Sequence, residues 1–205
     1  MGKSKYVITI TRQFGSMGRP IAKKMAEKLG IEYYDRELVD QAAEKLNLPV
    51  SRVSREEESA KKKICNPFFY MEYPMGKETN NTQEQIFEAQ KNIIKFLAEK
   101  ETCIIVGRCS DFVLSDMENA VHIYIYASYE ARLKHCIEDL NMEEAEARRM
   151  IAKVDEAREA YHVNFAGFKP DDKRFKDIMI DSSFLGVEGT ADYLVDAIKR
   201  KFQIF

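Results

Sequence analysis

The sequence predicts an α/β fold in which a mostly parallel sheet is covered by helices on both faces. Short segments rich in β-branched and aromatic residues alternate with longer segments of helical periodicity along the chain. One short segment is apolar at every position, which is typical of a central parallel strand buried on both faces. At 205 residues the chain suits one domain. The predicted strands are Tyr6–Thr11, Ile31–Tyr34, the fully apolar Cys103–Val106, Val121–Tyr126 and Asp177–Asp181.

The first strand leads into a glycine loop and a helix. Gly15 and Gly18 follow Tyr6–Thr11, and residues 21–29 then carry an apolar stripe with helical spacing. Amides at a helix N-terminus lack intrahelical partners and attract anions, and Arg19 adds a positive charge there. The loop therefore predicts a phosphate site. A plain strand–helix turn, with glycines that permit tight geometry, explains the loop equally well when it is considered alone.

The loop departs from the phosphate-loop consensus G-x-x-x-x-G-K-S/T. If Gly18 is the second glycine, Gln13 stands at the first, Arg19 replaces the lysine and Pro20 replaces the magnesium-binding hydroxyl. A dinucleotide-type G-x-G-x-x-G is also absent. The loop alone does not distinguish a phosphate site from a plain strand–helix turn, so other segments of the sequence are needed to choose between them.

Charged residues directly follow two more of the predicted strands. Ile31–Tyr34 is followed by Asp35 and Arg36, and the fully apolar strand is followed by Gly107 and Arg108. In parallel sheets ligands bind just beyond the carboxyl ends of the strands, and a guanidinium offers a bidentate fork to phosphate. Asp35 is equally well placed to cap the next helix. Together with the glycine loop, these strand ends predict a site for a poly-anion at one sheet edge.

A long helix near the carboxyl end carries several charged residues. Asn141 with Glu144 predicts its start, and it reaches about residue 164. Arg148, Asp155 and Arg158 fall near one face of it. For any one of them alone, a surface ion pair with a neighbouring residue is the commoner explanation. The other predicted helix starts are Thr82 and Ser128.

Residues 64–81 form the one irregular, strongly aromatic stretch of the sequence. Such a segment packs over the core as a loop or forms a wall against a flat ligand such as a nucleobase.

Composition excludes several classes of protein. The net charge of −2 gives no general attraction to nucleic acid or to an anionic membrane. The four cysteines form no C-x-x-C pair, and the three histidines lack metal-binding spacing. With no long apolar span and no secretory leader, we expect a cytoplasmic protein with free thiols. The oligomeric state is not indicated.

Four segments in order resemble one family. ITRQFGSMGRPIAKKMAEKLGIEYYDRELV, IIVGRCSDFVL, VDEAREAY and IDSSFLGVEGTA resemble the cytidylate kinase-like family of P-loop nucleoside monophosphate kinases. The resemblance implies a three-layer P-loop NTPase-like core over residues 1–205, with a helical monophosphate-binding insertion at 36–100 and a lid at about 132–170. It implies transfer of the ATP γ-phosphoryl group to a nucleoside monophosphate, such as CMP or dCMP, or to a related small acceptor.

The resemblance also implies roles for particular residues. The loop from Gly15 to Arg19 is similar to the family's G-S-G-G-R, with Met17 in place of a glycine. Asp155 and Arg158 match the D-x-x-R of the lid, but Ile151 stands where the preceding arginine belongs, so Arg148 is a substitute. The implied catalytic residues are Arg19, Arg148, Asp155 and Arg158, with Arg132 as a further lid arginine. The implied ATP-binding residues are Gly15, Ser16, Met17, Gly18, Arg19, Asp181 and Ser182, the last two in a D-S-T-like segment near the adenine. The implied acceptor-binding residues are Asp35, Arg36 and Arg108.

Magnesium is implied together with ATP, but its ligands cannot be identified from the sequence. Pro20 stands at the position of the usual hydroxyl. Either Ser16 coordinates the metal or the nucleotide brings its own hydrated ion. These departures keep two other classes of protein open: a nucleotide-binding protein without catalysis, and an interaction module that retains only the fold.

Overall fold

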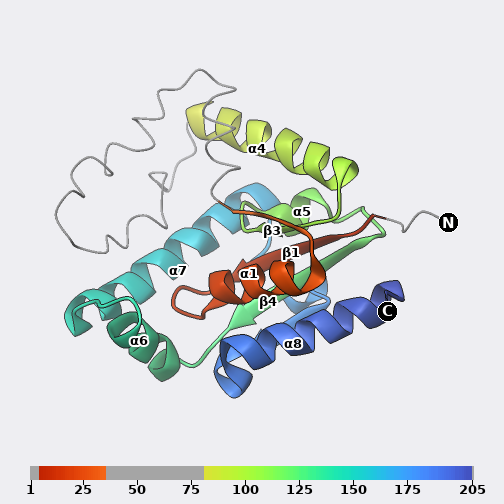
Figure 1. The fold of residues 1–205 in the computed structure, drawn as a ribbon. Coiled ribbons are helices and arrows are strands. Elements are labelled where there is room, and N and C mark those ends of the chain that lie inside the picture. Colours follow the sequence, from red (N-terminus) through yellow and green to blue (C-terminus); the bar gives the residue numbers. More distant parts are fainter. Residues whose placement is uncertain (1–4, 36–80, 205) are drawn as a thin grey trace, which may run out of the picture.

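The computed structural model describes residues 5–35 and 81–204 and contains one sheet of five strands in the order β2-β3-β1-β4-β5 (Figure 1). Every recorded pairing between neighbouring strands is parallel. The strands are β1 (Val7–Arg12), β2 (Glu32–Tyr34), β3 (Cys103–Val106), β4 (Ala120–Tyr126) and β5 (Ile178–Asp181). The predicted α/β class, with a parallel sheet, is confirmed.

Helices cover both faces of the sheet, which gives three layers (Figure 1). On one face, α1 (Gly18–Leu29) and α8 (Ser182–Phe202) pack on side chains such as Ile8 and Ile10 of β1. On the other face, α4 (Asn81–Lys100) and Leu114, which directly follows α5 (Ser110–Val113), pack on Val7 of the same strand. Successive side chains of β1 thus point to opposite faces, as strand geometry requires.

Two further helices form a pair beside the sheet. α6 (Tyr129–Glu138) and α7 (Glu144–Ala166) share an apolar cluster that includes Cys136, Met150 and Val154. Phe14, from the glycine loop, is 3% exposed and belongs to the same cluster. The helix pair and the loop are therefore packed as one unit.

The helix starts test the capping predictions. Ser128 caps α6 as predicted, since its side chain accepts a hydrogen bond from the Ala131 amide. The predicted start of α7 at Asn141 is wrong: the helix begins at Glu144, and Glu143 occupies its cap without a side-chain hydrogen bond. Asn141 instead has φ of +53° in the turn that leaves α6. Asparagine tolerates this left-handed conformation well, so it serves the turn rather than the cap.

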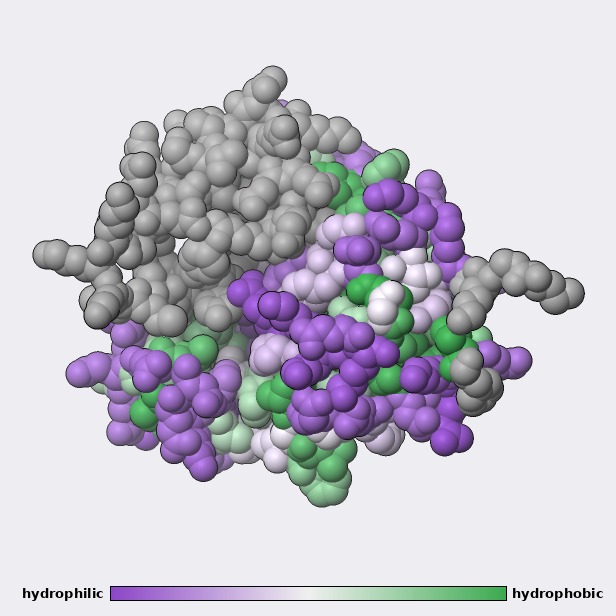
Figure 2. Space-filling model, in the orientation of Figure 1, coloured by the Kyte–Doolittle hydropathy of each residue, from purple (hydrophilic) through white to green (hydrophobic). Residues whose placement is uncertain are grey.

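α8 is interrupted near its start. Gly186 has φ of +66° and a non-helical ψ, which kinks the helix after its first turn. In the view of Figure 2, hydrophilic side chains cover most of the described surface, and hydrophobic residues form small separate groups. Within residues 5–35 and 81–204, no helix is both long enough and apolar enough to cross a membrane. Arg36 and the aromatic stretch of residues 64–80, for which the sequence predicts roles, lie outside the described residues.

Candidate functional site

The glycine loop joins β1 to α1 and presents its backbone at the helix N-terminus. Gly15 has φ of +75° and Met17 has φ of +57°, so the chain turns twice through left-handed conformations before α1 begins at Gly18. Among the described residues, the amides from Gly15 to Gly18 donate no recorded hydrogen bond. Unpartnered amides at a helix N-terminus, with the positive end of the helix dipole behind them, form a site for an anion.

Buried and half-buried side chains hold this loop from behind. The Phe14 amide donates to Asp155 Oδ1 at 2.7 Å, and Asp155 also forms an ion pair with Arg132. The Ser16 hydroxyl contacts the carbonyl oxygens of Gln13 and Ile125 at 3.0 and 3.1 Å. These contacts fix the loop before any ligand binds, which is the preorganisation that anion binding requires.

Two residues of the D-S-T-like segment, Asp181 and Ser182, form hydrogen bonds with the nearby backbone. The Ser182 hydroxyl contacts the Ser16 carbonyl oxygen at 2.7 Å, so it supports the glycine loop directly. Asp181 accepts hydrogen bonds from the amide and hydroxyl of Ser183 and so caps α8. The role of these two residues near an adenine stays a prediction.

A cluster of arginines surrounds one buried carboxylate. Asp35, 5% exposed at the end of β2, accepts a hydrogen bond from Arg19 Nε and one from the Tyr33 hydroxyl at 3.2 Å. Arg12 Nη2 lies 3.8 Å from the other carboxylate oxygen. Burial opposes ionisation of Asp35, but the charges of Arg12 and Arg19 outweigh it and lower the pKa of Asp35. Asp35 is therefore an ionised anchor for at least two guanidinium groups.

Arg158 and Arg108 complete this arginine cluster. Arg158, on α7, donates from Nη1 to the Arg12 carbonyl oxygen at 3.0 Å. Burial, followed by the Arg12 charge, lowers the pKa of Arg158, and Arg108 contributes in the same direction. Arg108 is also close enough to interact electrostatically with Arg12 and with Asp35. The structure thus brings Arg19, Asp35, Arg108 and Arg158 together next to the glycine loop.

Arg12 is the functional candidate that the sequence analysis missed. It is the last residue of β1 and its side chain is 14% exposed. The signal was present, because the position of Arg108 just after a buried strand favoured that residue, and the same rule applies to Arg12.

Arg148 does not join the cluster. Its side chain is 51% exposed and pairs with Glu144, and its Nη1 lies 3.3 Å from the Tyr129 hydroxyl. Ten residues separate it from Arg158 on the same helix, or about 15 Å along the axis. Its predicted catalytic role therefore depends on a movement of α7.

A pocket lies between the glycine loop and the helix pair, with a cavity volume of about 140 Å³ among the described residues. Its lining includes Arg12, Arg19, Arg158 and, from the α6 side, His135 and Leu140. Pockets for drug-sized ligands usually hold about 300–1,000 Å³. The described part of the pocket thus has room for phosphate groups but not for a whole nucleotide.

The described residues do not provide a magnesium site. Ser16 is fully buried and its hydroxyl is turned to backbone carbonyl groups, which removes it as the predicted alternative ligand. Asp35 and Asp155 are both engaged by arginines. Within the described ranges, no group of three or more His, Cys, Asp or Glu side chains could hold a metal ion.

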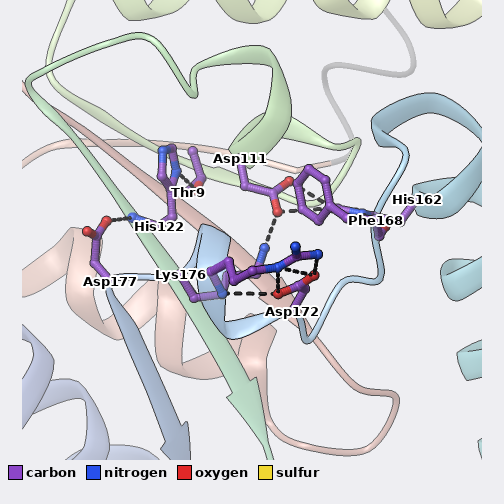
Figure 3. Close-up of polar contacts among 9 residues, drawn as sticks. Thr9, Asp111, His122, His162, Phe168, Asp172, Lys176 and Asp177 are labelled. Carbon is purple, nitrogen blue, oxygen red and sulfur yellow. Dashed lines mark hydrogen bonds and ion pairs between the residues drawn. The ribbon is translucent and has the colours of Figure 1, made fainter.

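A second cluster of buried charges, shown in Figure 3, links α5, α7 and the segment that enters β5. Asp111 forms an ion pair with Lys176, and both side chains are at most 1% exposed. His162 Nε2 lies 3.0 Å from Asp111, and His162 Nδ1 donates to the Phe168 carbonyl oxygen at 2.8 Å. The His162 and Lys176 interactions outweigh burial and lower the pKa of Asp111. This cluster fixes the carboxyl end of α7 to the core.

Solved structures share this fold. An uncharacterized protein from Eubacterium ventriosum is 28% identical, with a TM-score of 0.67 over 98% of this chain and 100% of its own. A gluconokinase from Sinorhizobium meliloti (12% identical, TM-score 0.54) and a shikimate kinase from Bacteroides thetaiotaomicron (13%, 0.53) each match 98% of this chain and 100% of their own. At these low identities the two kinases show a shared fold alone.

The comparison with curated proteins finds no significant match. The model of the cytidylate kinase-like family, in contrast, matches residues 7–184. The match begins at β1 and spans the glycine loop, the Gly107-Arg108 turn, α6, α7 and the start of α8. The resemblance read from four segments of the sequence is confirmed, and the chain belongs to the cytidylate kinase-like family.

Proposed function

We propose that this protein transfers the γ-phosphoryl group of ATP to a nucleoside monophosphate, CMP or dCMP in the first instance, or to a related small acceptor. The observation that carries the proposal is the convergence at one sheet edge of the free loop amides with Arg12, Arg19, Arg108 and Arg158. Phosphoryl transfer depends mainly on positioning and on neutralising phosphate charge, and this cluster suits both tasks.

Each ligand has its own set of residues in this proposal. The loop amides and Arg19 hold the ATP phosphates, with Asp181 and Ser182 on the donor side. Arg108 holds the acceptor phosphate, and Asp35 and Arg36 orient the acceptor, Asp35 through the guanidinium groups that it binds. An acceptor oxygen attacks the γ-phosphorus and the bond to the bridging oxygen breaks, which leaves ADP. Asp155 holds Arg132, and with Arg158 these lid residues exclude water.

The acceptor can be identified by measuring ADP formation. Purified protein is incubated with ATP and magnesium and with one acceptor at a time: CMP, dCMP, UMP, AMP, GMP, shikimate or gluconate. We expect ADP to form with a pyrimidine monophosphate at a rate well above that of ATP alone. The last two acceptors correspond to the shikimate kinase and the gluconokinase that share this fold. Absence of acceptor-dependent ADP with all seven would contradict the proposed activity for these acceptors.

A nucleotide-binding protein without catalysis is the second candidate. It is favoured by Pro20 at the position of the magnesium-binding hydroxyl and by the burial of the Ser16 hydroxyl. In this case ATP raises the melting temperature, as any ligand of the folded state does, while no acceptor yields ADP. A third outcome, in which no nucleotide raises the melting temperature, would favour an interaction module.

We expect Arg158→Ala to lower the transfer rate far more than Arg148→Ala. Arg158 is half-buried and donates a hydrogen bond to the Arg12 carbonyl group, whereas Arg148 is exposed and paired on the surface. A transition-state guanidinium contributes several kcal/mol, so the first change should cost at least about 100-fold in kcat. Steady-state kinetics of both variants check this expectation. Equal losses would show that the lid brings Arg148 into the site during turnover.

A further inference from the structure

Arg12 occupies a space that two glycines leave open. A Cβ atom on Gly18 would lie 2.7 Å from Arg12 Cβ, and one on Gly107 would lie 2.3 Å from Arg12 Nη1. Both distances are shorter than the closest approach of real Cβ atoms. Gly18 opens α1 at the donor loop, and Gly107 lies in the turn after β3. The Arg12 side chain therefore runs between the two segments assigned to donor and acceptor.

The charge around Arg12 is not balanced by the described residues. The group of Arg12, Arg19, Arg108, Arg158 and Asp35 contains four guanidinium groups and one carboxylate, a net charge of +3. Arg19 is in hydrogen-bond contact with Asp35, whereas Arg12 is 3.8 Å away. Crowding half-buried cations without matching anions is costly. A ligand that supplies several negative charges at this point would relieve that cost.

We propose that Arg12 binds a phosphate group at the junction between the glycine loop and the Gly107-Arg108 turn, where it contacts the phosphoryl group that passes between the two ligands. This inference deepens the proposed function and rests on it for the identity of the ligands. The guanidinium suits this place because its fork can bind two phosphate oxygens at once. Gly18 and Gly107 are then required partly because they admit Arg12.

A purely structural role for Arg12 is the competing explanation. In that case Arg12 braces β1 against β2 through Asp35, and its removal lowers stability without changing anion affinity. At 3.8 Å Arg12 is beyond hydrogen-bond distance of Asp35, whereas the Tyr33 hydroxyl and Arg19 donate hydrogen bonds to it. The two explanations differ in what they predict for ligand binding, measured separately from thermal stability.

Calorimetric titration with inorganic tripolyphosphate tests the proposal. We expect Arg12→Met to reduce affinity at least about tenfold, the cost of one charge-assisted contact, and Arg12→Lys to recover part of it. Arg200→Met removes an exposed arginine of α8 and should leave affinity unchanged. Binding by Arg12→Met equal to that of the wild type would overturn the proposal, as would a wild-type protein that does not bind tripolyphosphate. Melting temperatures without ligand report any structural role.

Replacement of Gly107 provides a second test. Gly107→Ala should displace Arg12 and lower tripolyphosphate affinity as Arg12→Met does, with little further loss when the two changes are combined. Gly30→Ala is the matched control, because Gly30 also has positive φ, +64° against +76°, but has no atom within 4 Å of its added Cβ. A Gly107→Ala loss that is the same with and without Arg12 would overturn the steric argument.

The two proposals can fail separately. Arg12-dependent tripolyphosphate binding without ADP formation from any acceptor would refute the phosphotransferase and leave the Arg12 site intact. ADP formation that Arg12→Met does not slow, with unchanged tripolyphosphate affinity, would refute the role of Arg12 and leave the phosphotransferase intact.

Discussion

Arg19→Ala is expected to lose measurable ATP binding. Arg19 stands where the phosphate-loop lysine belongs, at the start of α1, and lines the pocket beside the free loop amides. Its guanidinium is oriented by Asp35. A hydrogen bond to a charged group contributes about 1.5–3 kcal/mol, and loss of a bidentate contact removes two of them. Calorimetric titration with ATP measures the loss.

Arg108→Ala and Arg200→Met are the comparison variants for this titration. Arg108→Ala should weaken binding of the acceptor more than binding of ATP, because Arg108 lies in the turn after β3 rather than in the glycine loop. Arg200→Met changes net charge equally at an exposed pair on α8 and should bind ATP normally. An Arg19→Ala protein that binds ATP as tightly as the wild type would remove the donor assignment.

Asp111→Asn is expected to lower the free energy of unfolding by about 3–5 kcal/mol. Removing one partner of a buried ion pair leaves the other charge without compensation, and the Lys176 side chain is fully buried. Typical domains are stable by only about 5–15 kcal/mol, so the effect is large. Urea unfolding at neutral pH measures it.

Two further variants isolate the cause of this loss. The double variant Asp111→Leu/Lys176→Met replaces the pair by apolar groups and should lose less than the sum of its single changes. Asp196→Asn breaks an exposed pair on α8 and should not change stability measurably. Unfolding of Asp111→Asn at the same urea concentration as the wild type would show that the cluster is energetically neutral.

The same carboxylate predicts a pH dependence. The pKa of Asp111 is lowered in the folded state, so the unfolded chain binds its proton at higher pH than the folded chain does. The stabilisation from Asp111 is therefore complete above the ordinary aspartate pKa of about 4 and is lost as pH falls through the folded value. The pKa of Asp35 is also lowered in the folded state, so its contribution to stability is likewise lost on acidification. The stability difference between wild type and Asp111→Asn should shrink on acidification below about pH 4.

The sheet was predictable because its signals are local. Apolar runs such as Cys103–Val106 and the stripe of α1 depend only on neighbouring residues, and the structure reproduces them to within a residue or two. The start of α7 was not predictable in this way. Asparagine is a common helix-capping residue, but Asn141 adopts a positive φ in the turn after α6 and does not cap α7.

The candidate site was only partly predictable, because its contacts join distant segments. The order of strand ends brought Arg19, Asp35 and Arg108 to one edge. No local pattern shows that Asp155 accepts from an amide 141 residues earlier, or that Gly18 and Gly107 both make room for Arg12. The Asp111–His162–Lys176 cluster is similarly invisible in the sequence, since its members come from three separate segments.

The central claim is that the free loop amides and the arginine cluster together bind a phosphate chain. Nuclear magnetic resonance of the ¹⁵N-labelled protein, titrated with ATP, tests it most directly. We predict the largest amide shifts at Gly15 to Arg19, followed by Arg12 and the Gly107-Arg108 turn. Shifts confined to other parts of the protein, with the amides of Gly15 to Gly18 unchanged at saturating ATP, would contradict the account.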